Sequence, residues 1–263
     1  MQQHMTQSNS SIEKIMATQN IQSDVYSQSH YFTAKRIIDL VIVILALPFL
    51  LPLFAIIAIL IKIDSPGAIF YTQERVGAKL YIKDSKVYWA QRLFKLYKFR
   101  SMRQGAASDL HQKFIEAYIN GDEEEMVRIQ QAGAEDTDNS EEKEVSLYKL
   151  TGDPRITRIG NFLRKTSLDE LPQILNVLFG DISLVGPRPA IPYEVEMYEP
   201  WHKQRLLTIQ GLTGAWQATG RSNVSFDEMV KLDIDYLENQ SLWLDAKILL
   251  WTVPAILLRK GAE

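Results

Sequence analysis

The longest apolar stretch of the chain covers residues 40–61, where every position is apolar or proline. An α-helix rises about 1.5 Å per residue, so this stretch is long enough to cross a hydrocarbon layer of about 30 Å. Pro48 and Pro52 lie near its centre, and each removes a backbone donor and bends a helix. The pattern therefore predicts a membrane helix with a bend in its middle.

The charges beside this helix leave two interpretations open. A helix that spans a membrane leaves most of its positive charge on the cytoplasmic side. The basic residues within 20 positions are nearly balanced, two before the stretch and three after it: Lys35 and Arg36, then Lys62, Arg75 and Lys79. The segment is therefore either a proline-kinked span or a re-entrant helix, bent at Pro48, that returns both ends to the cytoplasmic face.

The residues before the helix are polar. Residues 1–30 are rich in Gln, Ser and Asn and show no sustained apolar period, which predicts a disordered tail. They also lack the cationic start, short apolar segment and small-residue cleavage site of a secretory signal. The membrane helix is expected at residues 31–63, with Asp39 paired to Lys35 or Arg36 at the interface.

Residues 64–263 are predicted to form one mixed domain after the helix. A turn is expected at residues 65–67, followed by a short strand. Residues 88–102 interleave basic and aromatic side chains, which is typical of a strand or a helix with one wet face. A small sheet is therefore expected between residues 69 and 99.

The charge of the chain is unevenly distributed. Residues 121–144 hold ten acids against Arg128 and Lys143, a local balance of −8, and the rest of the chain carries +5. Residues 104–146 are therefore interpreted as a solvated acidic insertion, helical around residues 110–118 and disordered near 133–140. The basic remainder suits a partner rich in phosphate, such as a nucleotide or an anionic membrane surface.

The C-terminal stretch, residues 242–260, is also rich in apolar residues. Its apolar run, residues 248–258, is too short to span a membrane. A helix that lies in the interface, with Trp243 and Trp251 at headgroup depth, is one interpretation. A helix that packs in the core of the domain is the other.

Composition excludes several classes of site. The chain has no cysteine, which rules out disulfides, thiolate zinc sites and cysteine nucleophiles. With 46% hydrophobic and 23% charged residues, it can bury a sizeable core and is not a disordered or fibrous chain. No glycine-rich phosphate loop or dinucleotide fingerprint supports a kinase or a dehydrogenase. The histidines are scattered without ligand spacing and are interpreted as surface or core residues: His4, His30, His111 and His202.

The densest candidate chemistry lies in residues 151–189. Ser167 to Glu170 read "SLDE", which predicts a helix start with Ser167 as N-cap and Glu170 closing a capping box, unless Pro172 moves the cap to Asp169. A helix N-terminus keeps a carboxylate ionised. An ionised carboxylate can attack phosphorus, and Mg²⁺ takes one or two protein carboxylates together with phosphates and water. Nearby arginines would neutralise the oxygens of the transferring group.

Six blocks, in one order, closely resemble the bacterial sugar transferases, also called monotopic phosphoglycosyl transferases. The resemblance extends from about residue 31 to the C-terminus, excepting the acidic insertion. The blocks are "KRIIDL" at residues 35–40, "DSPGAIFYTQERVG" at 64–77, "YKFRSM" at 97–102, "DPRITRIGNFLRKTSLDELPQ" at 153–173, "GDISLVGPRP" at 180–189 and "GLTGAWQATGRS" at 211–222.

The resemblance implies a membrane enzyme that moves a sugar 1-phosphate from a nucleotide diphosphate sugar, usually a UDP-sugar, to a polyprenyl phosphate such as undecaprenyl phosphate. UMP would be released, Mg²⁺ would be the cofactor, and the step would start assembly of a surface polysaccharide or glycan. The enzyme would lie on the bacterial inner membrane, with its catalytic domain facing the cytoplasm. Nucleic acid is not an expected partner, and association with a second copy of the chain stays open.

Residue by residue, the resemblance implies that Asp169 is the nucleophile and that Glu170 is the magnesium ligand. It favours the re-entrant interpretation of the apolar helix. The implied fold is α/β or α+β, mostly helical, with a re-entrant helix, interfacial helices and a small sheet. The remaining matched positions are polar or basic residues expected around the phosphates and the nucleotide: Lys98, Arg100, Arg164, Arg188, Arg221 and Asp233.

Two other functions are compatible with parts of the sequence. A non-catalytic membrane adaptor would bind anionic lipid or nucleotide through its basic domain and recruit a partner through its acidic insertion. Paired acids beside arginines speak against it, because a pure binder does not need them. A membrane-anchored protein with an extracytoplasmic domain would require the apolar helix to span.

Overall fold

The computed structural model describes residues 25–83, 86–103, 109–134, 155–219 and 224–257 of the 263-residue chain. Helices dominate these residues, and the strands form two small sheets. The expectation of a mostly helical domain with a small sheet and one long apolar helix is therefore confirmed. The helices after α2 are α3 (Asp109–Asn120), α4 (Glu123–Ala134), α5 (Arg158–Lys165), α6 (Gln173–Phe179), α7 (Pro192–Met197), α8 (Ala215–Ala218), α9 (Phe226–Asn239) and α10 (Leu242–Leu257), with 3₁₀ turns η1 (Leu168–Glu170) and η2 (His202–Leu206).

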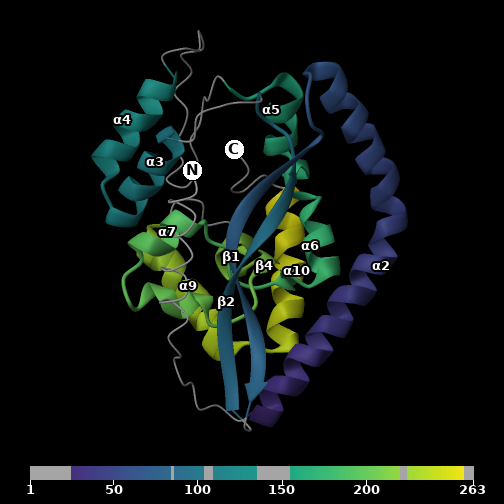
Figure 1. Ribbon diagram of the computed structural model, residues 1–263, viewed down its shortest axis with the longest axis vertical. Coiled ribbons are helices and arrows are strands. Elements are labelled where there is room, and N and C mark those ends of the chain that lie inside the picture. Colours follow the sequence, from purple (N-terminus) through teal and green to yellow (C-terminus); the bar gives the residue numbers. More distant parts are fainter. Residues whose placement is uncertain (1–24, 84–85, 104–108, 135–154, 220–223, 258–263) are drawn as a thin grey trace, which may run out of the picture.

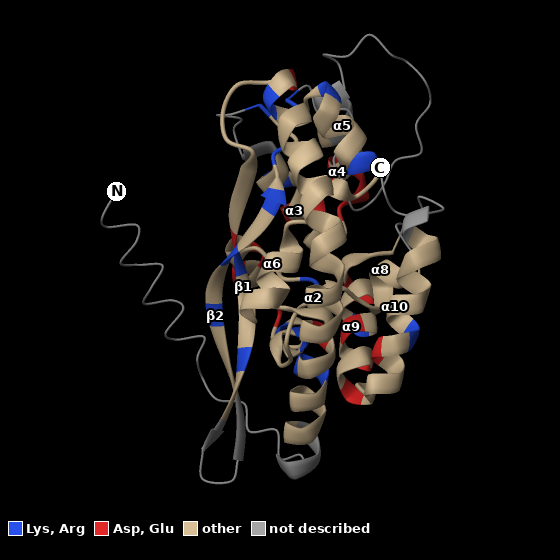
Figure 2. Cartoon of the chain, turned by 90° about the vertical axis from the view of Figure 1, so that its right-hand side faces the viewer, with Lys and Arg blue, Asp and Glu red and all other residues tan. Residues whose placement is uncertain are grey.

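Helix α2 (Val25–Asp64) contains the apolar stretch and both of its prolines. Among the described helices it alone is long and apolar enough to cross a membrane, judged by length and composition. It follows a bent course along the right-hand side of the molecule (Figure 1), and its central turns carry no charge where they face the viewer in Figure 2. Large side chains such as Phe49 stay exposed along it, as expected for a surface that meets lipid.

The first turns of α2 are bonded to the C-terminal helices. Lys35 Nζ lies 2.7 Å from the Asp245 carboxylate of α10, and both side chains are buried. Tyr31 donates to the same carboxylate at 2.9 Å, and Tyr236 of α9 donates to it at 2.7 Å. A buried polar cluster therefore fixes the start of α2 against α9 and α10.

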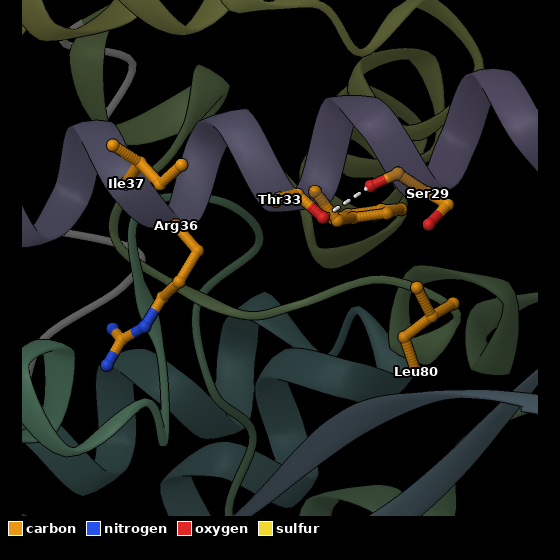
Figure 3. A pocket seen from close by; sticks show the side chains of 6 residues that line it. Ser29, Thr33, Arg36, Ile37 and Leu80 are labelled. Atoms are coloured by element: carbon orange, nitrogen blue, oxygen red, sulfur yellow. Dashed lines mark hydrogen bonds between the residues drawn. The ribbon is translucent and has the colours of Figure 1, made fainter.

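The expected pairing of Asp39 with Lys35 or Arg36 is wrong. Asp39 instead accepts a hydrogen bond from Ser183 Oγ at 2.7 Å, because the fold brings β3 (Ser183–Val185) against this turn of α2. Arg36 donates to the carbonyls of Val177 and Leu178 at the end of α6. Figure 3 shows the Arg36 side chain beside a cavity of about 500 Å³ that Ser29 and Leu80 also line.

The other end of α2 is bonded to the same domain. The Asp64 carboxylate accepts from the backbone N–H of Ile159 in α5 at 3.0 Å. Arg100 donates to the carbonyls of Ser65 and Pro66 at 2.7 and 2.8 Å. Both ends of the apolar helix therefore dock on one folded unit.

The larger sheet is a long antiparallel hairpin of β1 (Phe70–Lys83) and β2 (Lys86–Phe99), in which Val76 lies opposite Leu93. It confirms the sheet expected between residues 69 and 99, and the basic–aromatic stretch is a strand up to Phe99. The second sheet pairs β3 with β4 (Gly211–Thr213) in parallel. This pair of strands could not be predicted from the sequence, because strands of three residues are too short to show an alternation of apolar and polar positions.

The acidic insertion contains two packed helices. Helix α3 confirms the helix expected at residues 110–118, and α4, which was not expected, follows it after Gly121. Phe114, Tyr118 and Met126 are buried against α7 and α9 in one of the hydrophobic cores. Residues 135–140 of the stretch expected to be disordered lie outside the described residues.

Helix α10 combines the two interpretations made for it. Ile248 is buried in the core that also holds Val43 of α2. Trp243, Leu250 and Trp251 are exposed on other faces. The helix therefore packs on the domain and still presents apolar side chains to its surroundings; seating in a membrane interface stays a prediction.

Candidate active site

Asp169 and Glu170 lie in the single 3₁₀ turn η1 between α5 and α6. The expected capping box is wrong: within the described residues, the Ser167 side chain makes no cap hydrogen bond, and its backbone is left-handed with φ of 56°. Pro172 explains the difference, because its missing N–H stops a helix from running through this point. The Leu168 carbonyl is instead satisfied by Leu171 N–H at 3.2 Å, and α6 begins after the proline.

The two carboxylates have different surroundings. Asp169 is buried, with 8% of its surface exposed. Glu170 is partly exposed and accepts from Lys98 Nζ of β2 at 2.7 Å. The structure thus brings Lys98 to the paired acids, as expected, but it places the ammonium group on Glu170, where it balances one of the two negative charges.

Helix α5 delivers Arg164 directly before η1. The helix begins at an N-cap, Thr157, whose side chain accepts from Gly160 N–H at 3.0 Å. Gly160 lets α5 approach the chain after β2 very closely, since a Cβ there would lie 1.9 Å from the Ser101 carbonyl oxygen. The close contact sets the position of Arg164 in the last turn of α5 relative to the hairpin.

Arg188 lies in the segment that follows β3. Its carbonyl accepts from Arg205 at 3.4 Å, and Arg75 of β1 donates to the neighbouring Pro189 carbonyl at 2.9 Å. Two buried arginines therefore hold the backbone on which Arg188 is mounted. This support was not foreseen from the sequence.

The charges of several arginines act on His111. Burial lowers the pKa of His111 to about 4, and four positive charges act in the same direction: Arg75, Arg188, Arg164 and Arg155. The charges of Arg164 and Arg188, two of the expected site residues, thus act on the same imidazole. Arg75 and Arg155 were not singled out from the sequence, although both lie inside recognisable sequence blocks, where the density of arginines could have marked them. His111 was interpreted as a surface or core residue.

Two residues expected around the phosphates, Arg100 and Asp233, have other partners in the described part of the chain. Arg100 is buried and holds the turn after α2 through Ser65 and Pro66. Asp233 of α9 is 1% exposed and forms an ion pair with Arg205 at 2.6 Å. Arg221 lies outside the described residues. The direct role expected for Arg100 and Asp233 thus has no geometric support, and both stay predictions.

The side-chain oxygens of the site are suitable ligands for a hard cation. In the described part of the chain, no group of three or more His, Cys, Asp or Glu side chains could hold a metal by itself. Mg²⁺ needs fewer protein ligands, because it keeps waters and takes oxygens from substrate phosphates. The adjacent carboxylates of Asp169 and Glu170 fit that requirement, and Glu170 is the more accessible of the two.

Comparison with known proteins gives the chain a family. The model of the family "Bacterial sugar transferase" matches residues 30–259. The chain is 37% identical to the exopolysaccharide production protein ExoY of Sinorhizobium fredii, over 87% of this chain and 88% of that protein. It is 40% identical to the galactosyl transferase CpsE of Streptococcus agalactiae, over 90% of this chain and 45% of that protein.

A third relative has a description that includes its lipid substrate. The chain is 38% identical to the undecaprenyl-phosphate galactose phosphotransferase of Salmonella typhimurium, over 92% of this chain and 44% of that protein. The chain thus spans less than half the length of two of these relatives and most of the length of the third. Since the family model covers nearly all of it, the chain belongs to the bacterial sugar transferase family.

Proposed function

We propose that this protein transfers a sugar 1-phosphate from a UDP-sugar to undecaprenyl phosphate, releases UMP and so starts assembly of a surface polysaccharide or glycan. The relative from Salmonella typhimurium is an undecaprenyl-phosphate galactose phosphotransferase, and one from Xanthomonas campestris is a UDP-glucose:undecaprenyl-phosphate glucose-1-phosphate transferase. The observation that carries the proposal is the buried Asp169 next to Glu170, whose charge Lys98 balances, beside Arg164.

The reaction proceeds in two displacements at the same phosphorus. The Asp169 carboxylate attacks the phosphorus that bears the sugar, and the bond to the UMP oxygen breaks, with its electron pair leaving on UMP. The resulting aspartyl phosphosugar is attacked by a phosphate oxygen of undecaprenyl phosphate, which restores the carboxylate. Each step exchanges one phosphorus–oxygen bond for another, so neither needs a redox partner.

The side chains around Asp169 divide the remaining work. Arg164 and Arg188 neutralise the phosphate oxygens and orient the donor. Lys98 fixes the direction of the Glu170 carboxylate through their 2.7 Å contact. Mg²⁺, held by Glu170, would reduce the negative charge on the diphosphate when it is bound.

The apolar helix is proposed to be re-entrant, with the catalytic domain on the cytoplasmic face. A spanning helix would place its two ends on opposite sides of the bilayer. The contacts at Lys35 and Asp245, and at Asp64 and Ile159, bond both ends to one domain, which supports the re-entrant course. That domain would then meet the lipid phosphate at headgroup level and the nucleotide sugar from water.

The nucleophile is tested with Asp169→Asn. Purified protein is incubated with Mg²⁺, undecaprenyl phosphate and a panel of UDP-sugars, and released UMP is measured. The variant should lose about 10³-fold or more of the rate, because removing a nucleophile leaves only binding effects. Asp235→Asn, at an exposed acid of α9, is the matched control and should retain full activity.

The intermediate is tested with donor alone. Intact-mass measurement should then find one phosphosugar on the wild-type chain and on Asp235→Asn, but not on Asp169→Asn. Undiminished turnover by Asp169→Asn would contradict the assignment. Lipid binding that is unchanged by substitution of Asp169 and Glu170, together with no UMP release from any UDP-sugar, would favour the non-catalytic membrane adaptor.

The topology is tested by labelling single cysteines. Since the natural chain has no cysteine, each single variant introduces a unique exposed thiol. His30→Cys places it before the apolar stretch, and Lys79→Cys places it after the stretch. A re-entrant helix predicts that an impermeant maleimide labels both from the same face of sealed, oriented membrane vesicles. Labelling from opposite faces would show that the helix spans.

A further inference from the structure

Helix α3 of the acidic insertion turns one face toward the Arg188 segment. His111, Ile115 and Ile119 are four residues apart, so they share that face. Ile115 and Ile119 line a small cavity together with Arg188 and Pro189. His111 is therefore mounted on the side of α3 that faces the basic part of the candidate active site.

A hydrogen bond fixes the ring of His111. Its Nδ1 lies 2.7 Å from the hydroxyl of Tyr193, the second residue of α7. Burial raises the pKa of Tyr193, with the charge of Glu194 acting in the same direction, so the hydroxyl keeps its proton at neutral pH. When that hydroxyl donates to Nδ1, the other nitrogen, Nε2, carries the imidazole proton and is a donor.

The charges of four arginines from different segments act on this ring. Arg75 comes from β1, Arg164 from α5, Arg188 from the segment after β3, and Arg155 from the residues before α5. The other charged residues on α3 and on the helices packed against it are Asp109, Lys113 and Glu116 on α3, Glu123, Glu124, Glu125 and Arg128 on α4, Glu194 and Glu196 on α7, and Asp227, Glu228, Lys231, Asp233, Asp235 and Glu238 on α9.

We propose that His111, held by Tyr193, is a further residue of the donor site and that its Nε2 contacts the diphosphate of the nucleotide sugar. This inference rests on the proposed function, because it assigns the anion that the arginines receive. The acidic insertion then has a role in the reaction: it closes one side of the basic region with a neutral hydrogen-bond donor. Tyr193 is a positioning residue, since it acts through the His111 ring.

Binding of the anion has a consequence for the proton on His111. A diphosphate among the arginines cancels the positive charge that disfavours a cationic imidazole. The pKa of His111 therefore rises toward its ordinary value, and donor and proton bind with mutual support. Affinity should increase as the pH is lowered toward the pKa of the complex.

The proposal is tested by the binding of UDP, the part shared by all the candidate donors, so that no turnover is needed. His111→Gln should weaken UDP binding about tenfold, the value of one hydrogen bond to a charged group, between about pH 5 and pH 8. It should also flatten the pH dependence relative to the wild type. Lys113→Gln, on the exposed face of the same helix, is the control and should bind UDP like the wild type with the same pH dependence.

Two further measurements guard against a purely structural effect. Tyr193→Phe keeps the ring but removes the hydroxyl, and should weaken UDP binding by a smaller factor while the thermal midpoint stays close to that of the wild type. NMR of the wild-type imidazoles should show the His111 midpoint rising from about 4 when UDP is added. This measurement needs no variant at position 111 and so survives a misfolded His111→Gln.

The outcomes separate this proposal from the proposed function. His111→Gln that binds UDP as well as Lys113→Gln, or a His111 midpoint unmoved by UDP, overturns the role of His111 even if the protein releases UMP. UDP binding that depends on His111, without UMP release from any UDP-sugar, supports the site and contradicts the transferase.

Discussion

At the scale of single residues, Lys98 is an expected site residue whose partner the structure shows directly. It contacts Glu170 at 2.7 Å, with both side chains partly exposed, and its contact with phosphate stays a prediction. The contact gives Glu170 one defined orientation beside Asp169. Because the pair is not fully buried, its loss should affect catalysis more than stability.

Lys98→Met should therefore lower the rate of UMP release by about 10- to 100-fold, because Glu170 loses the group that orients it. The melting temperature should change little. Lys95→Met, at an exposed lysine of the same strand, is the matched control and should be nearly as active as the wild type. Equal activity of the two variants would show that the contact has no catalytic role.

The ion pair of Arg205 and Asp233 supports the backbone of the candidate site. Both side chains are almost fully buried, and their charged atoms lie 2.6 Å apart. Arg205 also donates to Tyr198 Oη at 2.9 Å and to the Arg188 carbonyl. Asp233 is thereby linked through Arg205 to the backbone that carries Arg188, a residue of the proposed phosphate site.

Asp233→Ala should lower the free energy of unfolding by about 3–5 kcal/mol, because it leaves a buried guanidinium without its partner. Chemical unfolding in detergent measures this loss. Asp235→Ala, an exposed acid two residues away, should change stability by less than about 0.5 kcal/mol. A double change, Asp233→Leu with Arg205→Met, should recover part of the loss, and the absence of any recovery would argue against the ion pair as its cause.

At the scale of elements, the close contact of α5 with the chain after β2 sets the geometry of the site. Gly160 faces the backbone of Ser101, where the carbonyl oxygen, unlike a flexible side chain, has no room to move aside. The neighbouring Thr157 N–H donates to the same carbonyl at 3.1 Å. This contact places Arg164 and η1 at a fixed distance from the hairpin.

Gly160→Ala should cost about 1–3 kcal/mol of stability or more, since the new methyl group forces two backbones apart. It should also reduce UMP release, because Arg164 moves with the helix. Asn161→Ala, at an exposed position of α5, is the control and should be neutral or slightly stabilising, since alanine is the better helix former. Thermal unfolding and UMP release of the two variants together check the prediction, and a Gly160→Ala protein as stable as Asn161→Ala would contradict it.

At the scale of the whole molecule, the two ends of α2 are fixed by different chemistry. The start is held by the buried cluster of Lys35, Asp245 and Tyr236, and the end by Asp64 with the backbone of Ile159. The fold therefore determines where the apolar helix enters and leaves the domain surface.

Lys35→Ala should release the start of α2, because it leaves the Asp245 carboxylate buried without its cation. Hydrogen exchange should then show residues 31–39 losing protection while residues 55–64 keep theirs. Lys62→Ala is the control, since that exposed lysine donates only to the nearby Gly67 carbonyl among the contacts described for it. Uniform loss of protection along α2 would mean that its two ends do not dock independently.

Part of the site could be predicted from the sequence because its residues are neighbours along the chain. Asp169 and Glu170 are adjacent, and Arg164 lies shortly before them, in the last turn of α5. Their closeness in the chain keeps them close in any fold. His111, Arg75 and Arg155 come from separate segments, and only the tertiary packing of those segments lets the two arginine charges act on the His111 ring.

The amino-acid sequence by itself determined the elements whose pattern is long or chemically constrained. The uncharged run of α2, the strands around residues 70–99 and the break imposed by Pro172 follow from local rules of burial and backbone hydrogen bonding.

Only the tertiary structure decided the partners of buried charges. Lys35 forms its ion pair with Asp245 and not with Asp39, and Asp233 forms its ion pair with Arg205. Charge attraction acts on whatever the fold brings within a few ångströms, and a buried ion must find a partner wherever the chain supplies one. The distances between these charged groups depend on how α2, α9 and α10 pack. Local sequence patterns do not specify that packing.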